Sequence, residues 1–127
     1  MSPRKRSAAQ ARADVLDFAI GLPGAFVDHP WGETVVKVDK KIFAFLGSDD
    51  SAHPPTIGLK LDESHEQALQ APGAEPSGYG LGRSGWVRIP LAAAAPSVGV
   101  LTDWVEESYR LVALKRRVAE LDRRAAP

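Results

Sequence analysis

The chain has 127 residues, of which 44% are hydrophobic and 25% charged, the composition of an ordinary globular protein that is large enough to bury a core. Sixteen basic and sixteen acidic residues give a formal net charge of zero, so we expect no overall electrostatic attraction to nucleic acid or to an anionic membrane. The absence of cysteine excludes disulfides, thiol catalysis and cysteine-bound metals.

Charge is distributed unevenly along the chain. The first 12 residues carry a net charge of +4 and the last 13 a net charge of +3, which leaves −7 for residues 13–114. We expect one domain over residues 1–127 with flexible basic tails at 1–7 and 122–127. The basic start lacks the apolar stretch of a signal peptide, and no window is apolar enough to span a bilayer. The sequence therefore predicts a cytoplasmic protein that has no membrane partner.

The first predicted element is a helix over residues 8–22. Its apolar residues, which include Ala11, Val15 and Ala19, recur at the spacing of one helical face. The Gly-Leu-Pro-Gly segment that follows position 20 ends the helix, because proline cannot extend the hydrogen-bonded backbone. A loop is predicted over residues 25–32.

Two strands, at residues 34–38 and 42–46, are predicted to form a hairpin. Both are rich in β-branched and aromatic residues, and a turn at Asp39-Lys40 separates them. This turn places Val36 opposite Phe43 and Thr34 opposite Phe45 on one face of the sheet. Lys37 then lies on the other face.

The second half of the chain contains two further alternating segments. In residues 56–61 the alternation points the aliphatic side chains inward and Lys60 outward, and in residues 86–91 it points Trp86 and Arg88 outward. A short helix at 62–70 and a Pro/Gly/Ser-rich loop at 71–85 lie between these two strands. A long helix begins at about residue 96 and is predicted to run past Leu121.

These elements predict an α+β fold. Hairpin-like strands with alternating patterns favour a two-layer arrangement, in which an antiparallel sheet carries the N-terminal and the long C-terminal helix on one face. The opposite face of the sheet would then present Lys37, Lys60, Trp86 and Arg88.

No motif predicts catalysis, a cofactor or a metal site. Gly80-Leu-Gly-Arg-Ser-Gly85 matches the spacing of a dinucleotide-binding loop, but it precedes a strand instead of a helix, so a hairpin loop is the better interpretation. The histidines, His29, His53 and His65, lack the spacing of a zinc pair. We therefore expect a protein that is not an enzyme and binds neither a cofactor nor a metal.

An ordered set of short motifs resembles the MmcQ/YjbR family. The set spans residues 22–112 and comprises Leu22-Pro-Gly24, Pro30-Trp-Gly32, Val36-Lys-Val38, Lys41-Ile-Phe-Ala44, Leu59-Lys60, Gly78-Tyr79, Gly85-Trp86-Val87, Ser108-Tyr109 and Leu111-Val112. The resemblance implies a bacterial protein with a fold similar to that of frataxin-like CyaY and of secretion chaperones. It implies mainly structural roles for Pro30, Trp31, Gly32, Phe43, Ser108 and Tyr109, and it carries over no catalytic residue.

The resemblance also implies DNA binding through a double-wing arrangement of hairpins. Under this first hypothesis basic side chains contact phosphates while aromatic rings stack on the bases of DNA or of a single strand. The candidates are Lys37, Lys41, Lys60, Tyr79, Arg83, Trp86 and Arg88. The wing segments, residues 33–91, carry a net charge of −2, however, and useful affinity for nucleic acid requires several neutralised phosphates.

Neutral charge favours a second hypothesis, that of a protein-interaction or chaperone-like module. Its open sheet face or its exposed edge strand would receive a segment of a partner. A small-ligand enzyme with a pocket near Trp31 and Lys60 is a third and more distant alternative.

Overall fold

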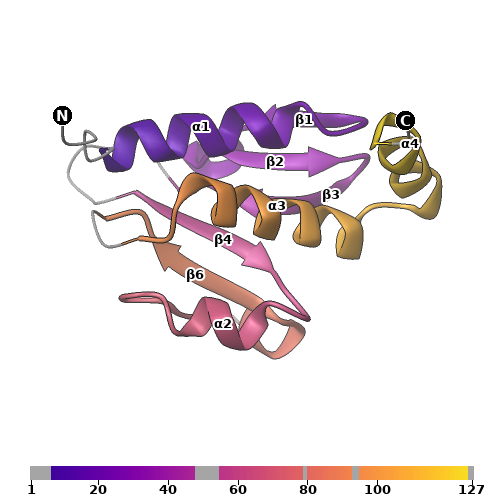
Figure 1. Ribbon diagram of the computed structural model, residues 1–127. Helices are drawn as coiled ribbons and strands as arrows, with labels where there is room; N and C mark the ends of the chain where they lie inside the picture. Colours follow the sequence, from indigo (N-terminus) through magenta and orange to yellow (C-terminus); the bar gives the residue numbers. More distant parts are fainter. Residues whose placement is uncertain (1–6, 48–54, 79, 93–94, 126–127) are drawn as a thin grey trace, which may run out of the picture.

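The computed structural model describes residues 7–47, 55–78, 80–92 and 95–125. Within these residues six strands form one antiparallel sheet in the order β1-β2-β3-β4-β6-β5, and the helices α1 and α3 lie side by side on one of its faces (Figure 1). The predicted two-layer α+β fold is therefore confirmed. The elements in chain order are α1 (Ala8–Ile20), β1 (Ala25–Asp28), the 3₁₀ turn η1 (Pro30–Gly32), β2 (Val35–Val38), β3 (Lys41–Phe45), β4 (Thr56–Lys60), α2 (His65–Leu69), β5 (Glu75–Pro76), the 3₁₀ turn η2 (Leu81–Ser84), β6 (Trp86–Pro90), α3 (Val98–Val112) and α4 (Lys115–Ala125).

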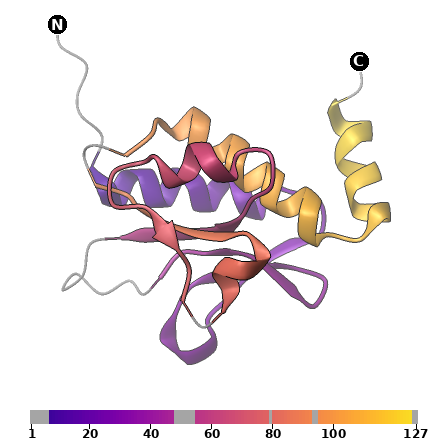
Figure 2. The ribbon, with the colours of Figure 1, turned by 90° about the horizontal axis from the view of Figure 1, so that it is seen from below.

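The core lies between the sheet and the α1/α3 layer, which Figure 2 shows on one side of the strands. Alternation in β4 and β6 points Ile57, Leu59, Val87 and Ile89 toward the helices, as predicted, and all four are fully buried. Helix α1 contributes Ala11, Val15 and Ala19, the predicted stripe. Its Ser7 side chain accepts a hydrogen bond from the Gln10 amide and caps the helix.

A strand occupies part of the predicted loop at 25–32. Residues 25–28 form β1, which pairs with β2 along its whole length and lies at one edge of the sheet. Phe26 and Val27 point to opposite faces of this edge strand, and each is more than 40% exposed. The prediction was wrong because a strand with no buried side has no alternating pattern, and its hydrogen bonds come from β2.

The β2–β3 hairpin has the predicted turn but not the predicted register. A bulge places Phe43 opposite no residue of β2, so that Val36 pairs with Ala44 instead of Phe43. At a bulge two successive side chains share one face, and both Phe43 and Ala44 are buried among the core residues. Phe45 is thereby turned to the opposite face of the sheet, which corrects its predicted position in the core.

The hydroxyl of Ser108, on α3, joins two strands of the sheet. It donates a hydrogen bond of 2.6 Å to the Phe43 carbonyl of β3 and accepts one of 3.0 Å from the Lys60 amide of β4. Ser108 is fully buried and takes the place of a direct bond at the point where the β3–β4 ladder ends. Its structural role, implied by the resemblance, has this physical basis.

We expect the replacement Ser108→Ala to reduce the free energy of unfolding by about 2 kcal/mol, since it leaves a part-buried amide and a buried carbonyl without their partner. Urea denaturation measures the loss. Ser84→Ala, at an exposed position of η2, is the matched control and should change stability by less than about 0.5 kcal/mol. A Ser108→Ala variant as stable as the control would contradict the bridging role.

The predicted long C-terminal helix is two helices. Helix α3 ends at Val112, Ala113 is extended with ψ near 153°, and α4 begins at Lys115. The junction contains neither glycine nor proline, so the sequence gives no local stop signal there. Helix α4 instead continues through Ala125, and residues 122–125 of the predicted basic tail are therefore helical.

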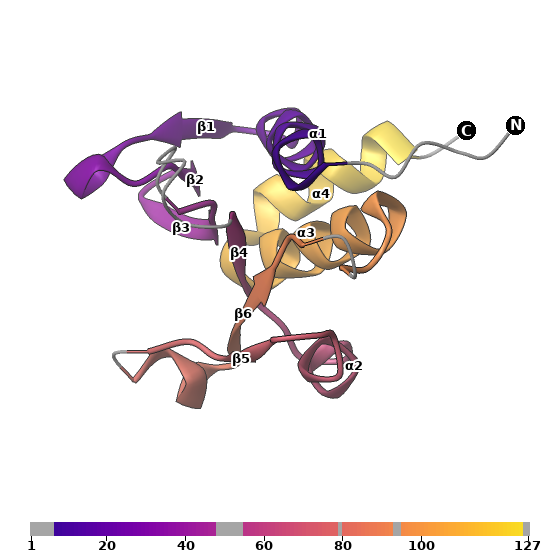
Figure 3. The ribbon, with the colours of Figure 1, turned by 90° about the vertical axis from the view of Figure 1, so that its left-hand side faces the viewer.

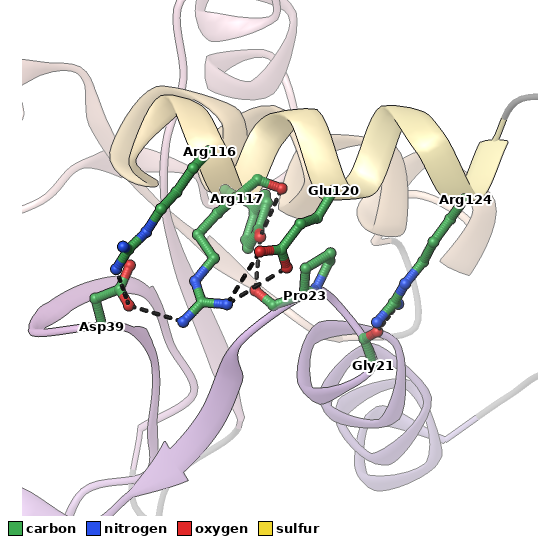
Figure 4. A network of polar contacts seen from close by, with 8 residues as sticks. Gly21, Pro23, Asp39, Arg116, Arg117, Glu120 and Arg124 are labelled. Carbon is green, nitrogen blue, oxygen red and sulfur yellow. Dashed lines mark hydrogen bonds and ion pairs between the residues drawn. The ribbon is translucent and has the colours of Figure 1, made fainter.

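Polar contacts hold α4 against the ends of α1 and of the β2–β3 hairpin (Figure 4). Arg117 donates to the Asp39 carboxylate at 3.1 Å, and Arg124 donates to the Gly21 carbonyl. The hydrogen bond that Arg117 donates to Asp39 raises the pKa of Arg117, so its charge is retained at all ordinary pH values. Tyr109 of α3 donates to the Pro23 carbonyl at 2.6 Å beneath this network.

Candidate functional site

The sheet face opposite the helices is concave and lies between two projecting arms (Figure 3). The first arm is the β1–η1 segment, residues 25–33, and the second arm is the β5–η2 segment, residues 75–78 and 80–84. The arms belong to the two edges of the sheet, since β1 is the first strand in its order and β5 is the last. The strongly twisted sheet lies between them.

A groove of about 200 Å³ occupies this concave face and connects the two arms. Its floor contains Phe45 of β3 and Gly58 of β4, which are directly paired. A Cβ atom on Gly58 would lie 3.3 Å from that of Phe45, so the absence of a side chain lets the Phe45 ring lie over β4. The walls come from Glu33, Gly47, Thr56, Ser77, Gly78, Leu81 and Arg88.

Trp86 packs against the Phe45 ring of the groove floor. Its ring meets that of Phe45 edge to face, with centroids 5.3 Å apart, and only 8% of the residue is exposed. Trp86 is on the predicted face of the sheet, but the bulge-shifted Phe45 covers it. It therefore does not offer the exposed ring that stacking on bases requires.

Two of the candidate phosphate contacts on the concave face are already paired with carboxylates. Lys37 forms an ion pair of 2.8 Å with Asp28, and Arg88 forms one with Glu75 across β6 and β5. The hydrogen bond from Lys37, together with one from the His29 amide, holds the pKa of Asp28 below its usual range. Both cations thus face a carboxylate, and these two residues add little unpaired positive charge to the face.

The other basic candidates lie in two separate hollows. Lys60 and Arg83 line one of about 470 Å³ together with His65, Asp62 and Glu66. Lys41 lines another, beneath the α3–α4 junction. The structure therefore does not bring the seven predicted contacts together on one surface. Tyr79 and His53 lie outside the described residues.

No group of three or more potential metal-ligating side chains occurs within the residues that the structure describes. None of the helices in this described part has the length and hydrophobicity needed to cross a bilayer. The glycines of the dinucleotide-like motif serve the turn at η2: Gly80 and Gly85 have positive φ angles, and Gly82 lies against Pro76.

The family model YjbR matches residues 20–111, which is most of the chain. The chain belongs to the YjbR family. A crystal structure of the Deinococcus radiodurans protein DR2400, which has a DUF419 domain, resembles it with a TM-score of 0.68 and 24% sequence identity. The likeness covers 96% of this chain and 92% of that one, and it supports the fold alone. No curated protein matches the chain.

The residues that carry the family resemblance are chiefly those that build this YjbR fold. Phe43 and Tyr109 meet edge to face in the core, with centroids 5.3 Å apart, and Ser108 bridges two strands. Pro30, Trp31 and Gly32 form the η1 turn at the tip of the first arm, where Gly32 has φ +77°. The side chain of Trp31 is outside what the structure describes.

Of the groove residues only Arg88 was predicted, and the residues missed include Phe45, Gly58 and Leu81. The hairpin pattern placed Phe45 in the core because a bulge has no signature in an alternating strand. Leu81 lay within a predicted loop, where a single apolar residue carries no periodicity. A glycine inside the otherwise regular strand at 56–61 was the one available signal, since such a glycine often marks a close approach.

Proposed function

We propose that this YjbR-family protein is a non-catalytic interaction module that accepts an extended segment of a partner protein in the groove between its two arms. The observation that carries the proposal is the composition of the groove. Phe45 and Leu81 give it an apolar centre, and paired ions and hydroxyls surround that centre. Protein interfaces have this arrangement, a hydrophobic centre within a polar rim.

The electrostatics of the concave face support a peptide over a nucleic acid. Glu33 lies in the groove wall, and Arg88 is neutralised by Glu75. A phosphate backbone would have to displace such carboxylates and would gain few free cations in return. A peptide of mixed charge meets no such cost.

A peptide-display selection with random heptamers tests the proposal. Selected peptides should bind the protein. The substitutions Leu81→Asp and Ser77→Arg should each lower the affinity for these peptides about tenfold or more, because both changes place charge in the groove. Ile20→Asp, an equivalent change at a 42% exposed position of α1 away from the groove, should leave binding unchanged. Circular dichroism checks that every variant is folded. Equal binding by all of them would place the peptide elsewhere and refute the proposal.

Nucleic-acid binding is the second candidate function, and one observation favours it. Lys60 and Arg83 line the same hollow, between η2 and the start of α2, and neither forms an ion pair within the described residues. Fluorescence anisotropy of labelled single- and double-stranded DNA at low salt and at about 150 mM separates the two candidates. Our proposal expects no binding at the higher salt. Submicromolar binding there, abolished by Lys60→Glu with Arg83→Glu, would establish the nucleic-acid function instead.

A further inference from the structure

The hollow that Lys41 lines, which we name the elbow pocket, lies where α3 meets α4 and shares no lining residue with the groove. Its volume is about 530 Å³, within the range of small-molecule sites. It is lined by the tip of the β2–β3 hairpin, the last turn of α3, the α3–α4 junction and the first turn of α4. The lining residues are Val38, Asp39, Lys40, Lys41, Val112, Leu114 and Arg116.

The apolar part of the elbow pocket is incompletely covered. Val38 is buried at its base, while Leu114, in the two-residue junction between the helices, is 46% exposed. An aliphatic residue at a helix junction ordinarily packs inward, since burying a leucine side chain contributes about 2 kcal/mol. Contact with an apolar ligand would provide that burial.

The rim of the elbow pocket carries an excess of positive charge. Lys40 and Lys41 make no ion pair within the described residues, and Arg116 reaches the Asp39 carboxylate only at 3.9 Å. Asp39 is instead bound at 3.1 Å by Arg117 (Figure 4). Three cations thus surround an apolar base, and the one carboxylate of the rim is already engaged.

We propose that the elbow pocket binds an aliphatic carboxylate, with its chain on Val38, Val112 and Leu114 and its carboxylate between Lys40, Lys41 and Arg116. A chain that ends in a carboxylate matches both parts of the pocket, the uncovered aliphatic base and the cationic rim. Two sources share this chemistry, a free fatty acid and the apolar C-terminal residue of a protein chain. The site is separate from the groove, so the proposal does not depend on the proposed function.

Amide chemical-shift titration of the full chain tests the site. The probes are octanoate, its neutral and cationic counterparts octanol and octylamine, and the peptide acetyl-Gly-Gly-Leu with a free or an amidated C-terminus. Octanoate should shift the amides of residues 38–41 and 112–116, whereas octanol and octylamine should bind at least tenfold more weakly. If the free-acid peptide binds more tightly than octanoate, and the amidated peptide does not, the natural ligand is a protein C-terminus. If octanoate binds more tightly than the free-acid peptide, the natural ligand is a free fatty acid.

Variants separate the two parts of the elbow pocket. Lys40→Gln combined with Lys41→Gln should lower the affinity for octanoate about tenfold, and Leu114→Ser should lower it about fivefold. Lys115→Gln, an exposed neighbour outside the pocket, should leave the affinity unchanged. Equal binding of octanol and octanoate, or shifts centred elsewhere, would overturn the proposal. So would the absence of any saturable shift up to about 10 mM.

Discussion

Replacing Gly85 by alanine is expected to destabilise the protein by about 3 kcal/mol or more. Gly85 has φ +92°, where a residue with a Cβ is strained, and that Cβ would lie 2.7 Å from the Leu61 carbonyl oxygen. The close approach cannot relax cheaply, because the Leu61 amide also donates to the Gly85 carbonyl at 2.9 Å. The substitution therefore separates the start of β6 from the end of β4.

Gly80→Ala provides the matched control for this prediction. Gly80 has a similar φ of +78°, but a Cβ there would meet nothing within 4 Å. Its replacement should cost only the backbone strain, about 1 kcal/mol. Urea denaturation of both variants measures the difference. Equal losses of stability would show that the contact with Leu61 has no energetic weight.

The second large effect is expected at Tyr109, which is fully buried. Tyr109→Ala removes a ring that packs edge to face on Phe43 and should cost about 3–5 kcal/mol. Tyr109→Phe keeps the ring and loses the hydroxyl, which donates to the Pro23 carbonyl at 2.6 Å and reaches the Arg117 carbonyl at 3.5 Å, and this should cost about 1 kcal/mol. Thermal and urea unfolding of the two variants separate the packing from the hydroxyl. A Phe variant as unstable as the Ala variant would refute this division.

Tyr109 also predicts the pH dependence of stability. Burial raises the pKa of its phenol above the ordinary value, so in strong alkali the unfolded chain releases a proton that the folded chain retains. The contribution to stability is complete below pH about 10 and is lost as the pH rises above that value. The loss should be smaller in Tyr109→Phe. An identical alkaline decline in the wild type and the variant would assign it to other groups.

The sequence predicted the architecture well because in most elements apolar residues recur periodically on the one face that packs against the core. The stripe of α1 and the alternation of β4 and β6 are set by burial against the same core, which periodicity reports directly. The break between α3 and α4 could not be predicted, since Ala113 and Leu114 are compatible with a continuous helix. Distant contacts, such as that between Arg117 and Asp39, determine where α4 lies.

The concave face was predicted only in part, for a local reason. One inserted residue, Phe43, reverses the direction of Phe45 and so converts an expected core aromatic into the floor of the groove. The basic candidates were chosen by strand phase, which places Lys37 and Arg88 on the correct face. Strand phase contains no information on their carboxylate neighbours, because Asp28 and Glu75 belong to strands that had been predicted as loops.

The join that Ser108 makes has a mechanical consequence. Among the described residues only two pairs connect β3 to β4, against four between β2 and β3 and five between β4 and β6. The β3–β4 ladder is therefore shorter than the ladder on either side of it, and one arm lies on each side of this central line. Because helix α3 packs on both β3 and β4 and its Ser108 bonds to both, the helix ties the two halves of the sheet together, and with them the two arms, across this short ladder.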